Sequence, residues 1–143
     1  LKLWPLERAR AVTHAAMALC DIALPGFDDA EQLTGLSDPD AIADFYLKLG
    51  AKVVALTLGE EGTLVATEEK RERVKGRRVT AVDATAAGDT FDGAFLARLV
   101  AGDSPFEAAR YANAAAALST QGYGAVAPMP RKDVVDTFLA EGA

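Results

Sequence analysis

The chain has 143 residues, 50% of them hydrophobic and 25% charged, which is enough to bury one core and is typical of a folded globular domain. Its 15 basic and 21 acidic residues give a net charge of −6, and its one basic cluster alternates with Glu and Val like a solvated hairpin, so we expect no nucleic-acid partner. Because there is one cysteine, no Cys/His spacing for zinc and no apolar run of about 18 residues, we expect no internal disulfide, no zinc site, no membrane segment and a cytoplasmic location.

Helical and strand patterns alternate along the first part of the chain. Apolar residues recur at helical spacing after Pro5, Gly26 interrupts a short apolar run, and Ser37-Asp38-Pro39-Asp40 has the composition of a helix start. The expected elements, in chain order, are a helix over 5–19, a strand end at 20–25, a short helix over 28–33 and a helix that ends at Gly50.

The second part continues this alternation. A fully apolar run at 53–58 is typical of a buried parallel strand, and Ser104-Pro105-Phe106-Glu107 forms a capping box with proline at the first helical position. The expected elements are strands at 53–58, 63–67 and 78–82, a polar loop or frayed hairpin at 68–76, and helices ending near 101, spanning roughly 106–121 and spanning 131–139. Strands that alternate with helices predict an α/β fold, with a largely parallel sheet flanked by helices, in one domain over residues 1–143.

The most informative stretch is 82–95, where small residues lead into a carboxylate as an apolar helix begins. The first amides of a helix have no intrahelical partner and carry the positive end of its dipole. A loop of Ala and Gly lets an anion approach these amides closely, and Asp89 follows directly in the first turn. The pattern therefore predicts an anion site with a base beside it, although an isolated first-turn Asp can also simply favour the helix dipole.

This stretch resembles the second signature of the ribokinase-like (PfkB-type) sugar kinases, D-T-x-G-A-G-D-x-F. The matching residues are Asp83, Ala87, Gly88, Asp89 and Phe91. Ala84 and Ala86 depart from the commonest form, in which Thr and Gly stand at these two positions. The resemblance implies that Ala86, Ala87 and Gly88 form an anion hole for the transferring phosphoryl group, and that Asp89 takes the proton from the substrate hydroxyl.

The resemblance also implies an incomplete kinase. Members of the family are considerably longer, and their sugar-binding half and lid precede the point where this chain starts. Residues 1–143 are therefore expected to be the C-terminal, nucleotide-binding part of a ribokinase-like fold, within a protein that forms a homo-oligomer at full length.

Two further segments resemble the family's nucleotide site. Residues 57–62 lie at the carboxyl end of the best predicted strand. They match the family's T-L-G-x-x-G segment, although G-x-x-G after a strand is often only a turn. The resemblance implies ATP contacts from Thr57, Gly59, Glu60 and Gly62. Asn113 lies in an Ala-rich helix that lines the adenine pocket in the family, but an Asn in such a helix can equally bond to nearby backbone or face solvent.

Cation sites are implied in the same way. Residues 25–29 occupy the place of the family's P-N-x-x-E motif, with Gly26 and Asp29 in place of Asn and Glu. Asp29 can still hold a Mg²⁺-bound water, or it can serve only as a first-turn acid of a helix. The loop at 122–130 resembles one that helps to bind a monovalent cation such as K⁺, together with Asp83 and Thr85.

These observations predict ATP-dependent phosphorylation of a sugar hydroxyl. Four segments most resemble 2-keto-3-deoxygluconate kinases, which makes that sugar acid, phosphorylated at the 6-position, the expected substrate: Leu3-Trp4, 24–29, 91–98 and 123–128. The alternatives are another sugar or nucleoside kinase, such as ribokinase or fructokinase, and a noncatalytic nucleotide-binding fragment. The sequence has no P-loop, no protein-kinase H-R-D or D-F-G motif and no Rossmann G-x-G-x-x-G motif.

Overall fold

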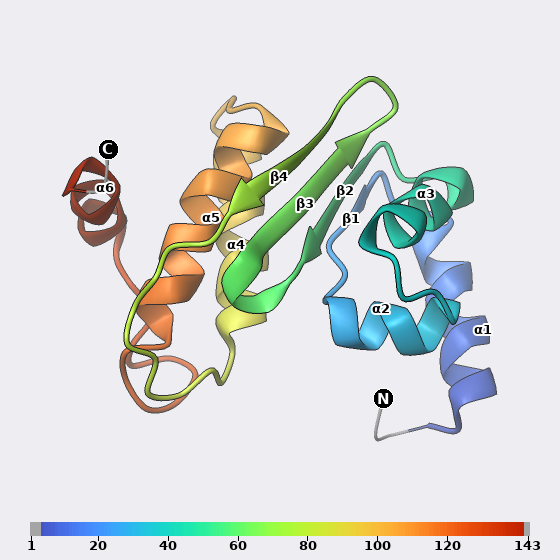
Figure 1. Cartoon of the computed structure of the whole chain (residues 1–143), viewed down its shortest axis with the longest axis horizontal. Helices are drawn as coiled ribbons and strands as arrows, with labels where there is room; N and C mark the ends of the chain where they lie inside the picture. Colours follow the sequence, from blue (N-terminus) through green and yellow to red (C-terminus); the bar gives the residue numbers. More distant parts are fainter. Residues whose placement is uncertain (1–3, 142–143) are drawn as a thin grey trace. The chain divides into compact units, whose positions relative to one another are not determined.

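The computed structural model describes residues 4–141, so Leu3 of the resemblance lies outside the described residues (Figure 1). Internal contacts divide the chain into two compact units. The first comprises Leu1–Leu58 and Leu64–Arg73, and the second comprises Gly59–Thr63 and Val74–Ala143.

The first unit holds helices α1 (Leu6–Met17), α2 (Phe27–Thr34) and α3 (Pro39–Leu49) and strands β1 (Ile22–Ala23) and β2 (Val53–Thr57), with most of β3 (Gly62–Thr67) and β4 (Arg71–Lys75). The sheet has the order β1-β2-β3-β4, and β1 pairs in parallel with β2 in a register that places Ile22 opposite Val53. β3 and β4 run in opposite directions (Figure 1), because residues 68–70 are too short a connection for parallel strands.

The core of the first unit positions the carboxyl end of β2. Asp38 caps α3 by accepting hydrogen bonds from the N–H groups of Asp40 (3.4 Å) and Ala41 (3.2 Å). α3 then buries Ile42 and Tyr46 against the sheet residues Val54, Leu56 and Leu64, all of them nearly inaccessible to solvent. Burying aliphatic side chains of this size stabilises a fold by roughly 1.5–3 kcal/mol each, so the strand end that carries Thr57 is firmly held.

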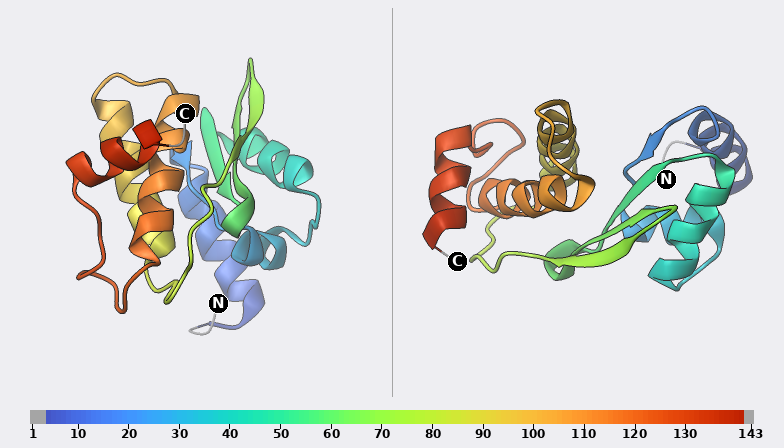
Figure 2. Two further views of the ribbon diagram at one scale, coloured as in Figure 1. Left: turned by 60° about the vertical axis from the view of Figure 1, so that its left-hand side comes forward. Right: turned by 90° about the horizontal axis from the view of Figure 1, so that it is seen from above.

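The second unit contains the 3₁₀ turn η1 (Gly59–Glu61), the start of β3, the end of β4 and helices α4 (Ala87–Val100), α5 (Pro105–Ser119) and α6 (Lys132–Glu141). α4 and α5 pack side by side (Figure 2). α5 begins with the predicted capping box, in which Ser104 Oγ accepts from the Glu107 N–H (3.3 Å) and the Glu107 carboxylate accepts from the Ser104 N–H (3.1 Å). On another side of α5, Ala114 and Ala115 form a small core with Val135 of α6.

One predicted strand is wrong. Residues 78–82 form no strand, because the N–H groups of Val82 and Asp83 both donate to the Thr120 carbonyl oxygen (2.7 and 3.0 Å) at the end of α5, not to a neighbouring strand. The last strand of the hairpin is instead β4, within the segment predicted as a loop or frayed hairpin.

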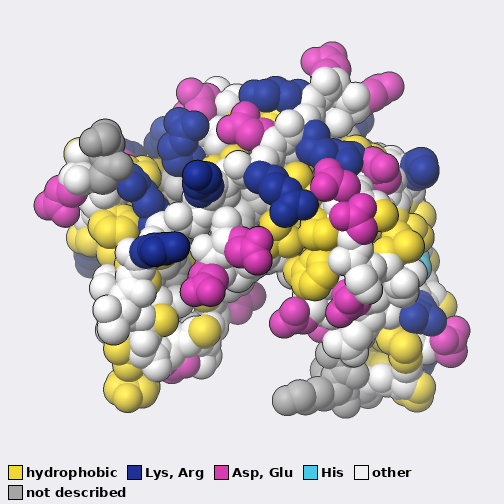
Figure 3. Space-filling view, in the orientation of Figure 1, with side chains coloured by type: hydrophobic (Ala, Val, Ile, Leu, Met, Phe, Trp, Pro, Cys, Tyr) yellow, Lys and Arg dark blue, Asp and Glu magenta, His cyan; other side chains and the backbone are white. Residues whose placement is uncertain are grey.

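The basic cluster on this hairpin is solvated, as expected, and two of its arginines form ion pairs. Arg71 forms ion pairs with Asp40 (3.0 Å) and Asp44 of α3, and Arg73 pairs with Asp40 (3.2 Å). Figure 3 shows basic side chains interspersed with acidic ones on the face in view. Within residues 4–141, no helix is both long enough and apolar enough to cross a membrane.

Candidate active site

The N-terminus of α4 presents backbone donors to solvent. Ala86 adopts a left-handed conformation (φ 59°, ψ 19°) and is the only non-glycine residue between 4 and 141 with a positive φ. The Ala87 N–H donates to the Ala84 carbonyl (3.1 Å), and the Thr90 N–H donates to that of Ala86 (2.9 Å). Within the described chain, the N–H groups of Gly88 and Asp89 have no acceptor.

The space in front of these amides is open. A Cβ built on Gly88 would meet nothing within 4 Å, so the packing of the protein does not itself require glycine there. Two unpaired amides at the positive end of a helix, on the exposed residues Gly88 and Asp89, fit a phosphoryl group. The Ala87 amide, expected in the anion hole, is already used by the turn that precedes the helix, and the Asp89 amide takes its place as a free donor.

Two carboxyl groups lie on the first turns of α4. Asp89 is exposed, whereas Asp92 is half-buried one helical turn later. Burial, and to a lesser extent the charge of Asp89, raises the pKa of Asp92 to about 6. A carboxyl group that titrates near neutral pH beside a candidate base is a feature of active sites as well as of buried ion clusters.

Asp83 joins the two loops that the sequence associates with a monovalent cation. Its carboxylate accepts hydrogen bonds from the Thr85 N–H (2.9 Å), the Thr85 hydroxyl (2.6 Å) and the Gly124 N–H (2.9 Å). These bonds, that from Gly124 foremost, lower the pKa of Asp83, so the group stays ionised. Asp83 therefore ties the signature loop to the loop at 122–130.

The turn at 59–62 is tightly fixed at one end and open at the other. Gly62 (φ +102°) lies so close to the end of β4 that a Cβ would be 2.2 Å from the Val74 carbonyl oxygen. Across the same junction, the Gly76 N–H donates to the Glu61 carbonyl (3.1 Å). Gly59 (φ +61°), by contrast, is exposed and faces open space. Close backbone packing thus explains Gly62, and Gly59 is the better placed of the two for a ligand.

Asn113 of α5 is buried, with 7% of its surface exposed. Its carbonyl oxygen accepts from the Thr63 hydroxyl (2.7 Å), and its amide group donates to the carbonyl oxygens of Val74 (3.0 Å) and Lys75 (3.4 Å). Of the alternatives considered for this residue, the structure has the one in which the side chain bonds to nearby backbone. A side-chain contact with adenine stays a prediction and would have to coexist with these bonds.

Two candidate residues belong to the first unit. Thr57 lies at the end of β2, where its N–H donates to the Pro25 carbonyl (3.0 Å) and Gly26 forms a parallel bridge with it. The start of the segment predicted to contact ATP, 57–62, therefore lies beside the segment predicted to hold Mg²⁺, 25–29, at the carboxyl end of β2. Asp29 is an exposed acid in the first turn of α2. Burial, and to a lesser extent the charge of Asp29, raises the pKa of Tyr46.

Residues 4–141 contain no group of three or more His, Cys, Asp or Glu side chains that could hold a metal ion. Mg²⁺ usually keeps several waters and binds through one or two carboxylates plus substrate phosphates, so a single acid such as Asp29 fits Mg²⁺ bound together with a nucleotide.

A family model described as pfkB family carbohydrate kinase matches residues 2–132. This chain belongs to the pfkB family. It is 36% identical over 134 residues to ribokinase from Staphylococcus aureus (strain COL), covering 90% of this chain and 44% of the relative. It is also 36% identical over 140 residues to 2-dehydro-3-deoxygluconokinase from Bacillus subtilis (strain 168), covering 96% of this chain and 43% of the relative.

Solved structures of pfkB-like kinases share the fold. A putative ribokinase II from E. coli in complex with ATP and Mg²⁺ has a TM-score of 0.87 at 29% identity, over 95% of this chain and 44% of that one. Fructokinase from Vibrio cholerae O395, bound to fructose, ADP and calcium, has a TM-score of 0.88 at 28% identity, over 96% of this chain and 47% of that one. The fold is therefore ribokinase-like, and this pfkB-family chain spans less than half the length of these relatives.

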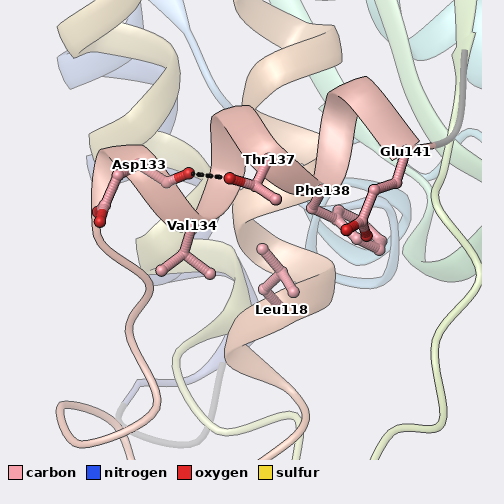
Figure 4. A pocket seen from close by; sticks show the side chains of 6 residues that line it. All are labelled: Leu118, Asp133, Val134, Thr137, Phe138 and Glu141. Carbon is pink, nitrogen blue, oxygen red and sulfur yellow. Dashed lines mark hydrogen bonds between the residues drawn. The ribbon is translucent and has the colours of Figure 1, made fainter.

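A shallow groove lies elsewhere in the second unit of this pfkB-family chain. It has a volume of about 320 Å³ and is lined by Leu118 of α5 and by Asp133, Val134, Thr137, Phe138 and Glu141 at α6 (Figure 4). No predicted site residue lines it, so it is not the candidate active site.

Sequence reasoning missed three residues near the candidate site: Asp92, Thr63 and Gly76. The three-residue spacing of Asp89 and Asp92 places both on one side of a helix and could have drawn attention to Asp92. Nothing in the local sequence indicates that Thr63 and Gly76 approach α5 and the turn, because those contacts join segments far apart in the chain.

Proposed function

We propose that the protein containing this chain transfers the γ-phosphoryl group of ATP to a sugar hydroxyl, and that this chain supplies the nucleotide side and the base. The observation that carries the proposal is the start of α4, where unpaired amides at Gly88 and Asp89 stand beside the Asp89 carboxylate. Phosphoryl transfer depends mainly on positioning and charge stabilisation, which is what such a helix start provides.

In this proposal each group has one role. The free amides at the start of α4 donate hydrogen bonds to the transferring phosphoryl oxygens. Asp89 accepts the proton of the acceptor hydroxyl as the new P–O bond forms. Bound Mg²⁺ neutralises phosphate charge, and Asp29 is the residue proposed to hold it, through water.

Nucleotide contacts are proposed for Thr57 in the first unit and for Gly59, Glu60 and Gly62 in the second. Asp83 and Thr85 are proposed to hold a monovalent cation such as K⁺ with carbonyls of the 122–130 loop. The Asp83 carboxylate already organises both loops, which supports this role.

For the substrate we propose 2-keto-3-deoxygluconate, phosphorylated to its 6-phosphate. The resemblance of the 24–29 and 91–98 segments and the 36% identity to the Bacillus subtilis kinase support it. Ribokinase from Staphylococcus aureus is equally similar in identity, which makes ribose the competing substrate. A sugar acid needs a cationic or hydroxyl-rich clamp for its carboxylate, and we place that clamp outside this chain.

The test uses a full-length protein that carries this chain and compares kcat/KM for 2-keto-3-deoxygluconate, ribose and fructose with ATP as donor. We expect the sugar acid to be preferred. A preference for ribose or fructose would overturn the substrate but not the chemistry, and no ATP-dependent phosphorylation of any of the three would favour the noncatalytic alternative.

The 143-residue chain alone is proposed to bind MgATP weakly and to phosphorylate no sugar. Sugar phosphorylation by the purified chain, measured as release of ADP, would contradict the proposal that the sugar-binding residues lie outside this chain.

A further inference from the structure

We infer that Asn113 is a positioning residue, which holds the 59–62 turn in the orientation that receives the nucleotide and acts through Thr63 and the end of β4. The inference rests on the proposed nucleotide-binding function. It assigns Asn113 a role in which it need not touch the nucleotide.

The first support is the hydrogen bonding of Asn113. One side chain on α5 joins Thr63, at the start of β3, to Val74 and Lys75, at the end of β4. Thr63 is 1% exposed and Val74 is 5% exposed, so water cannot replace the bonds that Asn113 makes with these two residues, whereas Lys75 is exposed. Leaving such a buried polar group unpaired costs roughly 1–3 kcal/mol, which strongly favours keeping Asn113, Thr63 and Val74 in register.

The second support is the close packing of the turn. Thr63 directly follows Gly62, whose backbone packs against that of Val74. A Cβ on Gly76 would lie 2.3 Å from the Glu60 carbonyl oxygen, so the turn has no room to shift toward β4. Asn113 thus fixes the strand residues on which the turn rests, while the exposed Gly59 end is left for a ligand.

The third support is where α5 leads. α5 packs along α4, and the first residues of α4 carry the free amides and Asp89. Within the second unit, contacts therefore run from the turn through Asn113 and α5 to α4, the helix whose first residues carry those amides. Asn113 is the side chain among these contacts that hydrogen-bonds to both strands of the hairpin.

The decisive variant is Thr63→Val, because Val has nearly the shape of Thr but cannot donate to Asn113. Thr63 is too deeply buried to touch a nucleotide itself, so an effect on binding must travel through the turn or through Asn113, and hydrogen exchange at 59–62 separates these two routes. Thr63→Ser restores the donor. The matched control is Thr67→Val on the same strand, which removes a hydroxyl that bonds only within the hairpin loop, to the Lys70 carbonyl (3.2 Å) and from the Lys70 N–H (3.0 Å).

Two readouts are taken on a full-length protein that carries this chain, namely the Kd for MgATP by calorimetric titration and hydrogen exchange of the 59–62 amides relative to the α5 amides. Losing one net hydrogen bond should raise Kd about 3- to 10-fold and speed exchange in the turn selectively. Thr63→Ser and Thr67→Val should behave like the parent. Thr63→Val should add no further loss of binding in an Asn113→Ala background.

Several results would overturn the inference. If Asn113→Ala weakens MgATP binding and Thr63→Val does not, Asn113 contacts the nucleotide directly. If both variants lower the unfolding temperature but leave Kd and the relative exchange of 59–62 unchanged, the bonds are merely structural. If the parent protein binds no MgATP, its proposed nucleotide-binding role fails, and selective exchange at 59–62 still decides whether Asn113 positions the turn.

Discussion

Replacing the half-buried Asp92 with Asn should stabilise the protein at neutral pH. The carboxyl group ionises near pH 3.8 when exposed in the unfolded chain and at about pH 6 in the folded one. Between these values the unfolded state has lost its proton and the folded state has kept it, so rising pH favours unfolding. The penalty is absent below about pH 3.8 and complete above about pH 6.

The size of the effect follows from the difference of about two pKa units, which corresponds to roughly 3 kcal/mol. Asp92 keeps some contact with solvent, which screens its charge, so we expect Asp92→Asn to gain on the order of 1–2 kcal/mol at pH 8. At pH 5 only part of the titration has occurred, and the gain should be about half as large.

Urea unfolding of the parent and of Asp92→Asn at pH 5 and pH 8 measures this difference. Asp28→Asn is a suitable control, because Asp28 is an exposed first-turn acid of α2 and its loss should lower stability by a few tenths of a kcal/mol. A loss of stability in Asp92→Asn at pH 8, or a gain equal at both pH values, would show that burial does not hold the proton on Asp92.

The remaining predictions concern the start of α4, the turn and α1. Gly88→Ala should leave the unfolding free energy unchanged or raise it by up to about 1 kcal/mol, yet weaken MgATP binding severalfold. Gly62→Ala should instead destabilise the fold, because its Cβ would overlap the Val74 carbonyl. Thermal melts and MgATP titrations of both variants distinguish the two effects. In a full-length protein, Asp89→Asn should reduce kcat about 10²- to 10⁴-fold while ATP still binds, and near-normal turnover would exclude Asp89 as the base. Burial and Arg10 lower the pKa of His14, so acidification through pH 6.5 should destabilise the parent more than His14→Phe, as pH-dependent unfolding would reveal.

Local patterns predicted the elements well, and the errors have a common cause. The helix starts predicted within 37–40 and at Ser104-Pro105 depend on residues adjacent in sequence, and both are confirmed, although the cap of α3 is Asp38 and not Ser37. The strand predicted at 78–82 failed because its fate depends on Thr120, far along the chain. Whether an extended segment joins a sheet is decided by the partners available to its backbone, which composition does not reveal.

The candidate site divides in the same way. The helix start beside Asp89 could be predicted because a run of small residues before an apolar helix is a local pattern, whereas anion binding there stays a prediction. The environment of Asn113 could not, because Thr63 and Val74 are brought to it only by folding. The same holds for Gly62, which the sequence assigned to the nucleotide and which close backbone packing already requires.

The start of α4 combines two unfavourable local features. α3 and α5 satisfy their first amides with Asp38 and with the Ser104 box, whereas α4, like α1 and α2, has no side-chain cap. Only α4 among the described helices combines the missing cap with a left-handed non-glycine residue, Ala86. Such a residue costs of order 1–3 kcal/mol, and within two turns Asp92 adds a second unfavourable term. A capping residue before α4 would satisfy its first amides, yet the sequence has none there. An uncapped helix start that lies this close to other unfavourable features is expected where a bound anion supplies the missing acceptor.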